Sequence, residues 1–434
     1  MGRIMRKSEI SIFSFCLFVI FLYPILPQYV YVVGGINMVN TLLAIFCFVY
    51  IFMYGKISRI ALKDSIIFYW VFMIMMTIKY LADAGPLKAA TYAMSFVLLP
   101  LFFISVIDTK SKFIKVIDTL IAAGLFLGIL GLIESVMKFN FIQLLASDGT
   151  EFFHEVRYGL LRIMTTFGQP IAYGLYQVFI IVLINYRKGV KHNKRYLNIC
   201  YVISTLNILL SVSRIPILAY IIMQILLIYR KSKKKFLNYM AFICVVALAG
   251  TIVGTAFGFK IPLVDDLLQT VDQLLSGNST SSSTTVGVGN RFDLWMWVYL
   301  SMGNNWVWGN GAITKFAYKV YEWQTKTSIE NQYLFILWHN GLVGLVLLIL
   351  SYVSTLRFSW KRRHCYMDQD KEGLSFNYVV FILMAVYYVV ALGVQETDLT
   401  RMYSIMIALL IAYNRVANKS EGNKAGNEIK EQAS

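Results

Sequence analysis

Three arginines, Arg162, Arg214 and Arg291, combine a residue type and a position that suit the binding of a phosphate or diphosphate. Each lies next to an apolar run, and the membrane sidedness derived below places all three on the outer face. A guanidinium group makes paired hydrogen bonds to phosphate oxygens. Three such groups near a lipid interface would neutralise a lipid diphosphate as it leaves, which is electrostatic stabilisation of developing charge.

The outward arginines belong to polar segments that interrupt the apolar sequence. These segments are 157–170, 211–214, 291–295, 330–334 and 396–401. The alternative to anion binding is that an arginine extends to lipid headgroups or pairs with an acid such as Asp265, Asp266 or Asp293. Arg214 lies between two apolar runs, where a purely solvated role is hard to sustain, so we expect a function there.

Aromatic residues are concentrated in the one long hydrophilic stretch of the chain. It contains five of the eight tryptophans, Trp295, Trp297, Trp306, Trp308 and Trp323. Flat rings that face water are natural platforms for the apolar faces of sugar rings. The alternatives are an aromatic belt at the membrane interface and a small core within the loop itself.

The composition defines the class of protein. The chain has 434 residues, of which 58% are hydrophobic and 15% charged, and its mean hydropathy is +0.63. These values exclude one or two soluble domains and predict an all-α polytopic membrane protein. The net charge of +17 would suit nucleic acid, but the basic residues form short clusters between apolar runs, so no nucleic-acid partner is expected. The apolar windows predict about 12 membrane helices, near 9–26, 37–54, 60–79, 90–107, 116–136, 168–186, 196–211, 214–229, 237–257, 332–355, 376–394 and 402–414.

The basic clusters also predict which side of the membrane each connector faces. If the N-terminus is cytoplasmic and the windows alternate, most of the 40 Lys and Arg residues fall on the inner side. Both termini are therefore expected inside. The predicted organisation is nine membrane helices in 1–257, an outer loop in 258–331, three membrane helices in 332–414 and a disordered cytoplasmic tail in 415–434.

The outer loop divides by composition. Residues 261–275 have apolar positions at helical spacing and predict an amphipathic helix that lies on the membrane or covers a cleft as a lid. Residues 276–289 are rich in Ser, Thr and Gly and predict a flexible hinge for that lid. The ends of the loop, near Arg291 and Glu330, are expected to carry its chemistry.

Coupled transport and metal chemistry find little support in the sequence. Few ionisable groups lie within the apolar windows, and the clearest is Glu134, near the outer end of its helix. A proton- or ion-coupled transporter usually has buried charges at the midplane, and we see no internal duplication of the transporter kind. The four histidines share no ligand spacing and no cysteine lies in the long loop, so we expect no metal and no cofactor.

The sequence resembles the O-antigen polymerase (Wzy) and O-antigen ligase superfamily of bacterial membrane proteins for polysaccharide assembly. Four pieces carry the resemblance: Arg162 with 166–170 (TFGQP), Ser213-Arg214, 291–295 (RFDLW) leading to 308–311 (WGNG), and 331–334 (NQYL) leading to 341–345 (GLVGL). Their order, with one long outer loop before the tenth window, makes the combination specific. The resemblance covers residues 150–350, and the first five windows match in hydropathy alone.

The resemblance implies a GT-C-like, metal-independent, inverting glycosyltransferase of the bacterial plasma (inner) membrane. Such a polymerase moves a growing glycan from undecaprenyl diphosphate onto a fresh lipid-linked repeat unit, for the O-antigen of lipopolysaccharide or for capsule. Arg162, Arg214 and Arg291 would hold the diphosphates. The implied partners are membrane lipid, undecaprenyl-diphosphate-linked oligosaccharide as donor and acceptor, a chain-length regulator and a flippase. The expected substrate contacts are Arg157, Asn331, Tyr333, Trp295, Glu396 and Arg401.

Glu330 marks a departure from the family pattern. Ligases of this superfamily typically place a His before the Asn at the end of the loop, as a base for the acceptor hydroxyl, and this chain has Glu330 there. A carboxylate can serve as general base where its geometry suits, so we assign that role to Glu330. His339 lies about two turns into the tenth window, too deep to replace it, and is expected to be a hydrogen-bonded packing residue.

The departure favours a polymerase over a ligase that joins finished glycan to a lipid or protein acceptor. A third function, a lipid-linked oligosaccharide flippase or other transporter, belongs to a different class. Such a transporter would bind its substrate between helices and would tolerate deletion of 276–289, because it needs no long outer loop.

Overall fold

A computed structural model describes residues 2–26, 32–33, 36–54, 66–145, 156–157, 159–190, 194–231, 288–321, 324–326, 328–366, 374–394 and 397–432. The predicted lid helix 261–275, most of the hinge 276–289, the window 237–257 and Glu396 lie outside these residues. The described chain forms two compact units. Unit 1 comprises Met1–Ile217, Val346–Tyr388 and Glu396–Ser434, and unit 2 comprises Leu218–Leu345 and Val389–Gln395.

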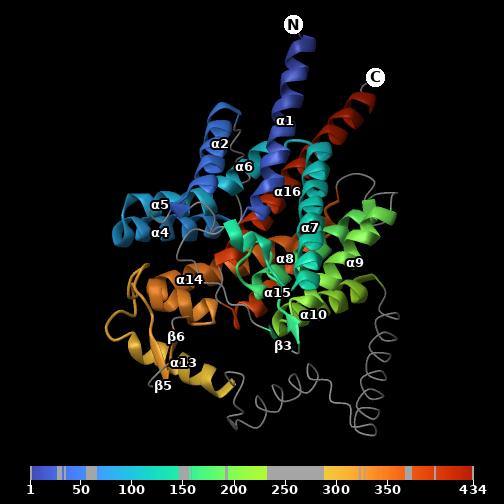
Figure 1. Ribbon diagram of the computed structural model, residues 1–434. Helices are drawn as coiled ribbons and strands as arrows, with labels where there is room; N and C mark the ends of the chain where they lie inside the picture. The colour runs from blue at the N-terminus through green and yellow to red at the C-terminus, as the bar shows by residue number, and fades with distance from the viewer. Residues whose placement is uncertain are drawn as a thin grey trace. The chain divides into compact units, whose positions relative to one another are not determined.

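Helices coincide with the predicted apolar windows wherever the chain is described (Figure 1). Those of the first half are α1 (Gly2–Ile25), α2 (Met38–Tyr54), α4 (Ile67–Ala84), α5 (Pro86–Ala93), a π-helix (Met94–Leu98), α6 (Leu99–Val106), α7 (Lys110–Met137), a 3₁₀ helix (Phe141–Leu145), α8 (Pro170–Val190), α9 (Lys194–Leu210) and α10 (Arg214–Lys231). Those of the second half are α13 (Val288–Ser301), α14 (Gln332–Lys361), α15 (Phe376–Val390) and α16 (Thr397–Gln432).

The described residues also contain three short antiparallel hairpins. They pair β1 (Val32–Val33) with β2 (Ile36–Asn37), β3 (Val156–Arg157) with β4 (Leu160–Leu161), and β5 (Tyr318–Tyr321) with β6 (Gln324–Lys326). No strand here is longer than four residues. The prediction of a mainly helical chain is therefore confirmed.

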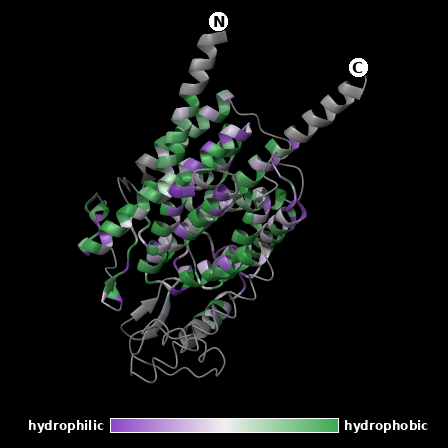
Figure 2. Ribbon diagram, turned by 90° about the vertical axis from the view of Figure 1, so that its right-hand side faces the viewer, coloured by the Kyte–Doolittle hydropathy of each residue, from purple (hydrophilic) through white to green (hydrophobic). Residues whose placement is uncertain are grey.

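Several helices have the length and apolarity of membrane spans. Four described helical runs meet both criteria, Ile67–Ala84, Pro86–Val106, Lys110–Met137 and Gln332–Lys361. Along α4, exposed apolar side chains recur every three or four residues and so line one helical face; they are Ile67, Val71, Ile74, Ile78 and Leu81. Figure 2 shows hydrophobic residues along most of the helices. Such exposed apolar surface suits lipid rather than water. The chain is a helical membrane protein, while the count of twelve spans stays a prediction.

Helix α7 packs closely against α8 and α9. A Cβ added at Gly131 would lie 2.2 Å from Asn207 Oδ1 and 2.5 Å from the Tyr173 hydroxyl. These two side chains hydrogen-bond to each other at 2.7 Å, and Asn207 Nδ2 donates to the carbonyl of Gly128 at 3.0 Å. Small residues and interhelical hydrogen bonds are what hold apolar helices together in lipid. This contact fixes the part of α7 that leads to Glu134.

A π-helix separates α5 from α6 at the position of a proline. Pro100 has no N–H, so the carbonyl of Phe96, four residues earlier, lacks its usual helical donor. The hydroxyl of Tyr69, a fully buried residue of α4, donates to this carbonyl at 2.8 Å. A hydrogen bond from a neighbouring helix thus compensates for the proline.

Replacing Tyr69 by Phe is expected to destabilise the protein by about 1–3 kcal/mol, because it leaves a buried carbonyl without this donor. Thermal unfolding of the purified protein in detergent measures the effect. Tyr80→Phe is the matched control, since the described residues give the Tyr80 hydroxyl no hydrogen bond. Equal unfolding temperatures for the two variants would show that the bond does not stabilise the bundle.

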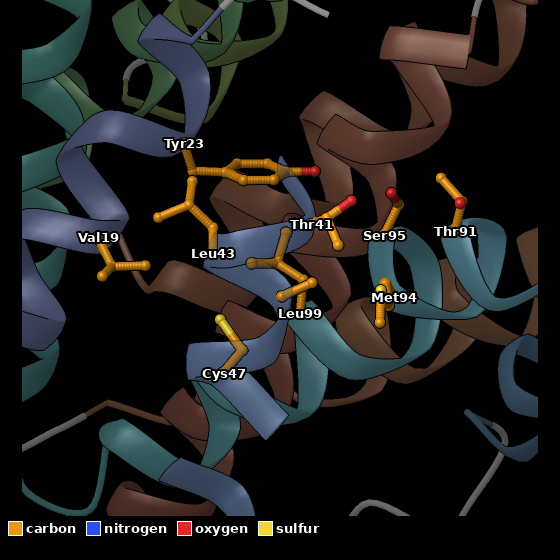
Figure 3. Close-up of a pocket in the computed structure, with 10 residues that line it drawn as sticks. Val19, Tyr23, Thr41, Leu43, Cys47, Thr91, Met94, Ser95 and Leu99 are labelled. Carbon is orange, nitrogen blue, oxygen red and sulfur yellow. The ribbon is translucent and has the colours of Figure 1, made fainter. Parts of the chain in front are cut away.

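A small cavity of about 30 Å³ lies beside the π-helix (Figure 3). Its wall is mainly apolar and includes side chains of α1, α2, α5 and the π-helix, such as Val19, Cys47, Thr91 and Ser95. A space of this size holds roughly one or two water molecules. None of the predicted site residues lines it, so it does not serve as their binding pocket.

Unit 2 has an apolar core of its own, formed by α13, the loop that follows it and the first turns of α14. The buried members are Leu294, Val298, Met302, Phe316, Ile329, Leu337 and Trp338. The Trp338 indole N–H donates to Ser301 Oγ at 3.0 Å, which ties α14 to the end of α13. The predicted outer loop therefore contains a folded part.

Helix α14 is broken at Gly341, whose φ of 66° and ψ of −168° are not helical. Backbone from the loop after α13 fills the break. Asn310 N donates to the Trp338 carbonyl at 2.8 Å, and Leu342 N donates to the Trp306 carbonyl at 2.7 Å. The freed groups of the helix thus find partners in another segment, as a buried backbone requires.

The sequence predicted a span near 332–355, and the structure adds a break inside it at Gly341. A Cβ at Gly341 would lie 2.1 Å from the carbonyl oxygen of Val307, so only glycine admits the loop so close. The apolar pattern continues on both sides of the break, and hydropathy does not register the interruption.

Helix α16 extends from Thr397 to Gln432 and so includes positions of the predicted tail 415–434, whose disorder stays a prediction. Its stretch 402–417 is buried in unit 1. An existing helix can add residues without a new nucleation step. The helical backbone beyond the buried stretch follows from that continuity.

Candidate functional site

The Arg162 side chain lies against the turn that carries Arg214. Its Nη2 donates to Ser213 Oγ at 2.7 Å, and its Nε donates to the Ser211 carbonyl at 3.4 Å. Ser213 is 2% exposed and Ser211 is fully buried. Arg162 therefore contacts the turn that directly precedes a second of the three arginines, Arg214, in unit 1.

A short hairpin leads the chain into Arg162. Arg157 of β3 pairs with Leu160 of β4, and Arg162 follows directly after the hairpin. The next residue, Ile163, donates its N–H to the carbonyl of Leu210 at 3.4 Å. The hairpin and this bond bring the 157–163 segment to the turn between α9 and α10.

Arg214 is the first residue of α10, at the positive end of the helix dipole. Pro216 lies in the same first turn, where a missing N–H costs no helical bond. Ser213 precedes the helix, and its carbonyl accepts from Ile217 N at 3.4 Å. A helix N-terminus next to arginine side chains favours a bound anion.

Backbone strain accompanies both arginines. Thr165 has a φ of 49° and Val212 a φ of 46°, and both side chains are β-branched. A β-branched residue in this left-handed region is a genuine outlier and costs about 1–3 kcal/mol. Such conformations persist only where the surroundings hold them, and they cluster at functional sites.

Glu134 in the last turn of α7 and Asn140, three residues after the helix ends, hold the strained segment. The Glu134 carboxylate, 4% exposed, accepts from Met164 N at 3.2 Å and from Thr165 N at 2.8 Å. Asn140 Nδ2 donates to the Thr165 carbonyl at 2.8 Å. The sequence marked Glu134 only as an ionisable group in an apolar window and Ser213 only as the neighbour of Arg214, and it gave no signal for Asn140. A carboxylate in such a helix is the signal that pointed here.

Glu330 and Asn331 directly precede α14 in unit 2. Asn331 caps the helix, because its Oδ1 accepts from Tyr333 N and Leu334 N, each at 3.0 Å. Glu330 is half-buried and has a φ of 52°, and Ile329 before it is fully buried in the unit 2 core. The Glu330 backbone is thus held on both sides, at a helix N-terminus whose dipole favours a carboxylate.

The other predicted site residues lie on three helices. Arg291 and Trp295 belong to α13, where the structure describes the backbone of Arg291 and the partly buried side chain of Trp295. Tyr333 in the first turn of α14 and Arg401 on α16 are also partly buried. Unit 1 therefore holds the Arg162 side chain against the turn that precedes Arg214, and Arg157 lies in the hairpin before Arg162. Unit 2 holds Glu330 directly before Asn331 and near Tyr333 in the sequence. The predicted meeting of these two sets stays a prediction.

The loop tryptophans divide between packing and exposure. Trp306 packs on the unit 2 core, and its ring lies 4.8 Å from that of Tyr299. Trp297 is 44% exposed and Trp308 is 66% exposed. A core within the loop thus accounts for Trp306, while Trp308 offers an exposed ring.

His339 has the packing role predicted for it. Its Nδ1 lies 2.7 Å from the carbonyl oxygen of Gly311, and the side chain is 7% exposed. Its ring contacts those of Phe335 and Trp338, with centroids 4.3 and 4.7 Å away. The prediction is confirmed.

The fold and these contacts define a class: a helical membrane protein with a candidate anion site at the α9–α10 turn. Comparison with protein families adds that residues 199–349, less than half of the chain, match the family described as O-antigen ligase. The match supports the resemblance to the O-antigen polymerase and ligase superfamily that the sequence shows. Members of the family are glycosyl-transfer enzymes. The match includes Arg214, Arg291 and Glu330, and Arg162 precedes it. No curated protein matches the chain.

Proposed function

We propose that the chain is a polymerase of undecaprenyl-diphosphate-linked oligosaccharide repeat units. It acts at the outer face of the bacterial plasma membrane by metal-independent, inverting glycosyl transfer. The contact between Arg162 and the turn before Arg214, at the edge of the O-antigen ligase match, carries the proposal. A GT-C-like arrangement of about 12 spans, cytoplasmic termini and an outer loop at 258–331 belong to the same proposal.

Arg162, Arg214 and Arg291 bind the donor diphosphate in the proposed reaction. The bond between the anomeric carbon and the phosphate oxygen breaks, and undecaprenyl diphosphate leaves with the electron pair. Positive charge placed beforehand at the leaving oxygens lowers the barrier, because the site need not reorganise as the charge develops. The Ser213 contact holds the Arg162 guanidinium in one orientation, which reduces the entropy lost on binding.

Glu330 is the proposed general base. It takes the proton of the acceptor hydroxyl as that oxygen bonds to the anomeric carbon from the face opposite the diphosphate, and the configuration inverts. The fixed backbone at Asn331 supports this role, because a base must be held within hydrogen-bond reach of its proton. The proposed contacts with sugars and diphosphates are Arg157, Asn331, Tyr333, Trp295, Glu396 and Arg401.

Replacing Glu330 by Gln is expected to lower kcat about 100-fold with little change in KM, because an amide cannot take the acceptor proton. Initial rates of purified protein with a lipid-linked repeat unit in detergent measure both constants. Glu330→Asp keeps the carboxylate and is expected to retain more activity. A wild-type kcat for Glu330→Gln would remove Glu330 from the reaction.

A ligase is the second candidate, and the description of the matched family favours it. The residue at position 330 favours the polymerase, since ligases of the superfamily typically place a His there. In a strain that lacks the chain, loss of a polymerase leaves surface glycan with a single repeat unit. Loss of a ligase instead leaves long chains on undecaprenyl diphosphate. Glycan length and attachment, compared on one gel, separate the two functions.

A further inference from the structure

We propose that Glu134 is a positioning residue that, with Asn140, holds Arg162 in the conformation that binds the lipid diphosphate. The inference rests on the proposed function of Arg162. Glu134 in the last turn of α7 and Asn140 just after it hydrogen-bond to the two peptide groups of Thr165. Glu134 accepts from Thr165 N at 2.8 Å, and Asn140 donates to the Thr165 carbonyl at 2.8 Å.

The left-handed backbone conformation of Thr165 depends on hydrogen bonds from other residues. Its φ of 49° is disfavoured for an L-residue, and the branched Cβ adds to the crowding. Hydrogen bonds to both peptide groups offset this cost and select the left-handed state. Without them the residue is expected to relax to an ordinary negative φ.

The conformation of Thr165 is transmitted to Arg162 through a short, fixed stretch of chain. Only two residues separate them, and Ile163 between them is bound to the carbonyl of Leu210. Each peptide unit is rigid, so a change in φ at Thr165 must displace its neighbours. The Arg162 guanidinium, whose Nη2 lies 2.7 Å from Ser213 Oγ, would then move away from its position on the turn.

Glu134 is distinct from the proposed base. Its carboxylate is buried in an apolar helix and accepts backbone N–H groups, whereas Glu330 is half-buried at a helix start. A carboxylate in such a helix is costly and needs the hydrogen bonds that the Arg162 segment supplies. Glu134 therefore acts through that segment and not on the acceptor.

The test measures the Kd of undecaprenyl diphosphate for the purified 434-residue chain in detergent. Glu134→Gln cannot accept both N–H groups and is expected to raise the Kd about tenfold, since small misplacements of a binding group are expensive. In the Arg162→Ala background the same change is expected to add little, because the two residues act as one unit. Glu134→Gln combined with Thr165→Gly is expected to recover binding, since glycine adopts a positive φ without help.

Asn140→Ala removes the hydrogen bond to the Thr165 carbonyl and replaces Glu134→Gln in the test if that variant does not accumulate. It is also expected to weaken the binding of undecaprenyl diphosphate only where Arg162 is present. Unchanged affinity in Glu134→Gln would overturn the inference. An effect that adds to that of Arg162→Ala, or that Thr165→Gly does not relieve, would also overturn it. If the wild-type chain fails to bind undecaprenyl diphosphate, or Arg162→Ala binds as tightly as wild type, the proposed function falls and the inference falls with it.

Discussion

Removing Arg162, which contacts the α9–α10 turn, together with Arg214, which follows that turn, in an Arg162→Ala and Arg214→Ala double variant, is expected to abolish detectable glycan polymer while the protein accumulates normally. Each group that stabilises departing charge is typically worth about 10²–10³ in rate, so the double loss exceeds that of any single site residue. The fold should tolerate the change, because Ser213 keeps its own bond to the Ser211 carbonyl at 3.0 Å. The measurement is surface-glycan length in a strain whose only copy carries the variant.

Two controls separate charge from geometry in this experiment. Arg162→Lys keeps the charge but loses the planar fork, and it is expected to give shorter chains than wild type. Arg357→Ala removes an exposed arginine of α14 on a segment assigned to the inner face, and it should give full-length glycan. Full-length glycan from the double variant would contradict the role given to these arginines.

Replacing Gly341 by Ala is expected to prevent unit 2 from folding. The added Cβ would lie 2.1 Å from the Val307 carbonyl oxygen and 2.6 Å from Trp308 N. Both are backbone atoms, which cannot turn aside as a side chain can. If this loop backbone moved away, the backbone groups at the break in α14 would lose their hydrogen-bond partners. Buried backbone groups without partners destabilise the fold. Yield of monodisperse protein after detergent extraction measures the effect.

Gly303→Ala is the matched control in the same unit. Gly303 also has a positive φ, 50°, but nothing lies within 4 Å of a Cβ added there. Alanine then costs only the left-handed conformation, about 1–2 kcal/mol. We expect Gly303→Ala to accumulate with a slightly lower unfolding temperature. Wild-type yield from Gly341→Ala would mean that the loop does not pack into the helix break.

Hydropathy and residue type predicted the helices and two of the arginines of the candidate site. The apolar windows mark helices because a chain in lipid must satisfy its backbone within each segment. Arg214 stood out because an arginine between apolar runs is costly, and Arg162 because it precedes the TFGQP segment. The contact between Arg162 and the turn before Arg214 required the structure, since residues 162 and 213 are far apart in the chain.

The features that position the site were beyond the sequence because they depend on contacts between distant segments. Glu134 accepts hydrogen bonds from the backbone N–H groups of Met164 and Thr165. Every residue type except proline has such a group, so the sequence does not identify the partner. The break at Gly341 is equally hidden, because what fills it is the backbone around Trp306. The sequence did show a glycine, Gly341, inside an apolar run. Glycine in such a run also marks ordinary close contacts between helices, so it does not by itself predict a break.

Asn331 illustrates a residue with two explanations. The resemblance made it a substrate contact, and the structure shows its Oδ1 capping α14. The sequence pattern is typical of a helix N-cap, because an Asn directly before an apolar run with helical spacing often starts a helix. Its role toward substrate stays a prediction, and the cap explains how it can hold Glu330 in place.

The most direct test of the account incubates the purified chain with a defined undecaprenyl-diphosphate-linked repeat unit in the presence of a chelator, then sizes the glycan over time. A polymerase is expected to give a ladder that grows by whole repeat units, with one undecaprenyl diphosphate released for each new linkage. A glycan that stays at one repeat unit, or that moves to another acceptor without growing, would contradict it.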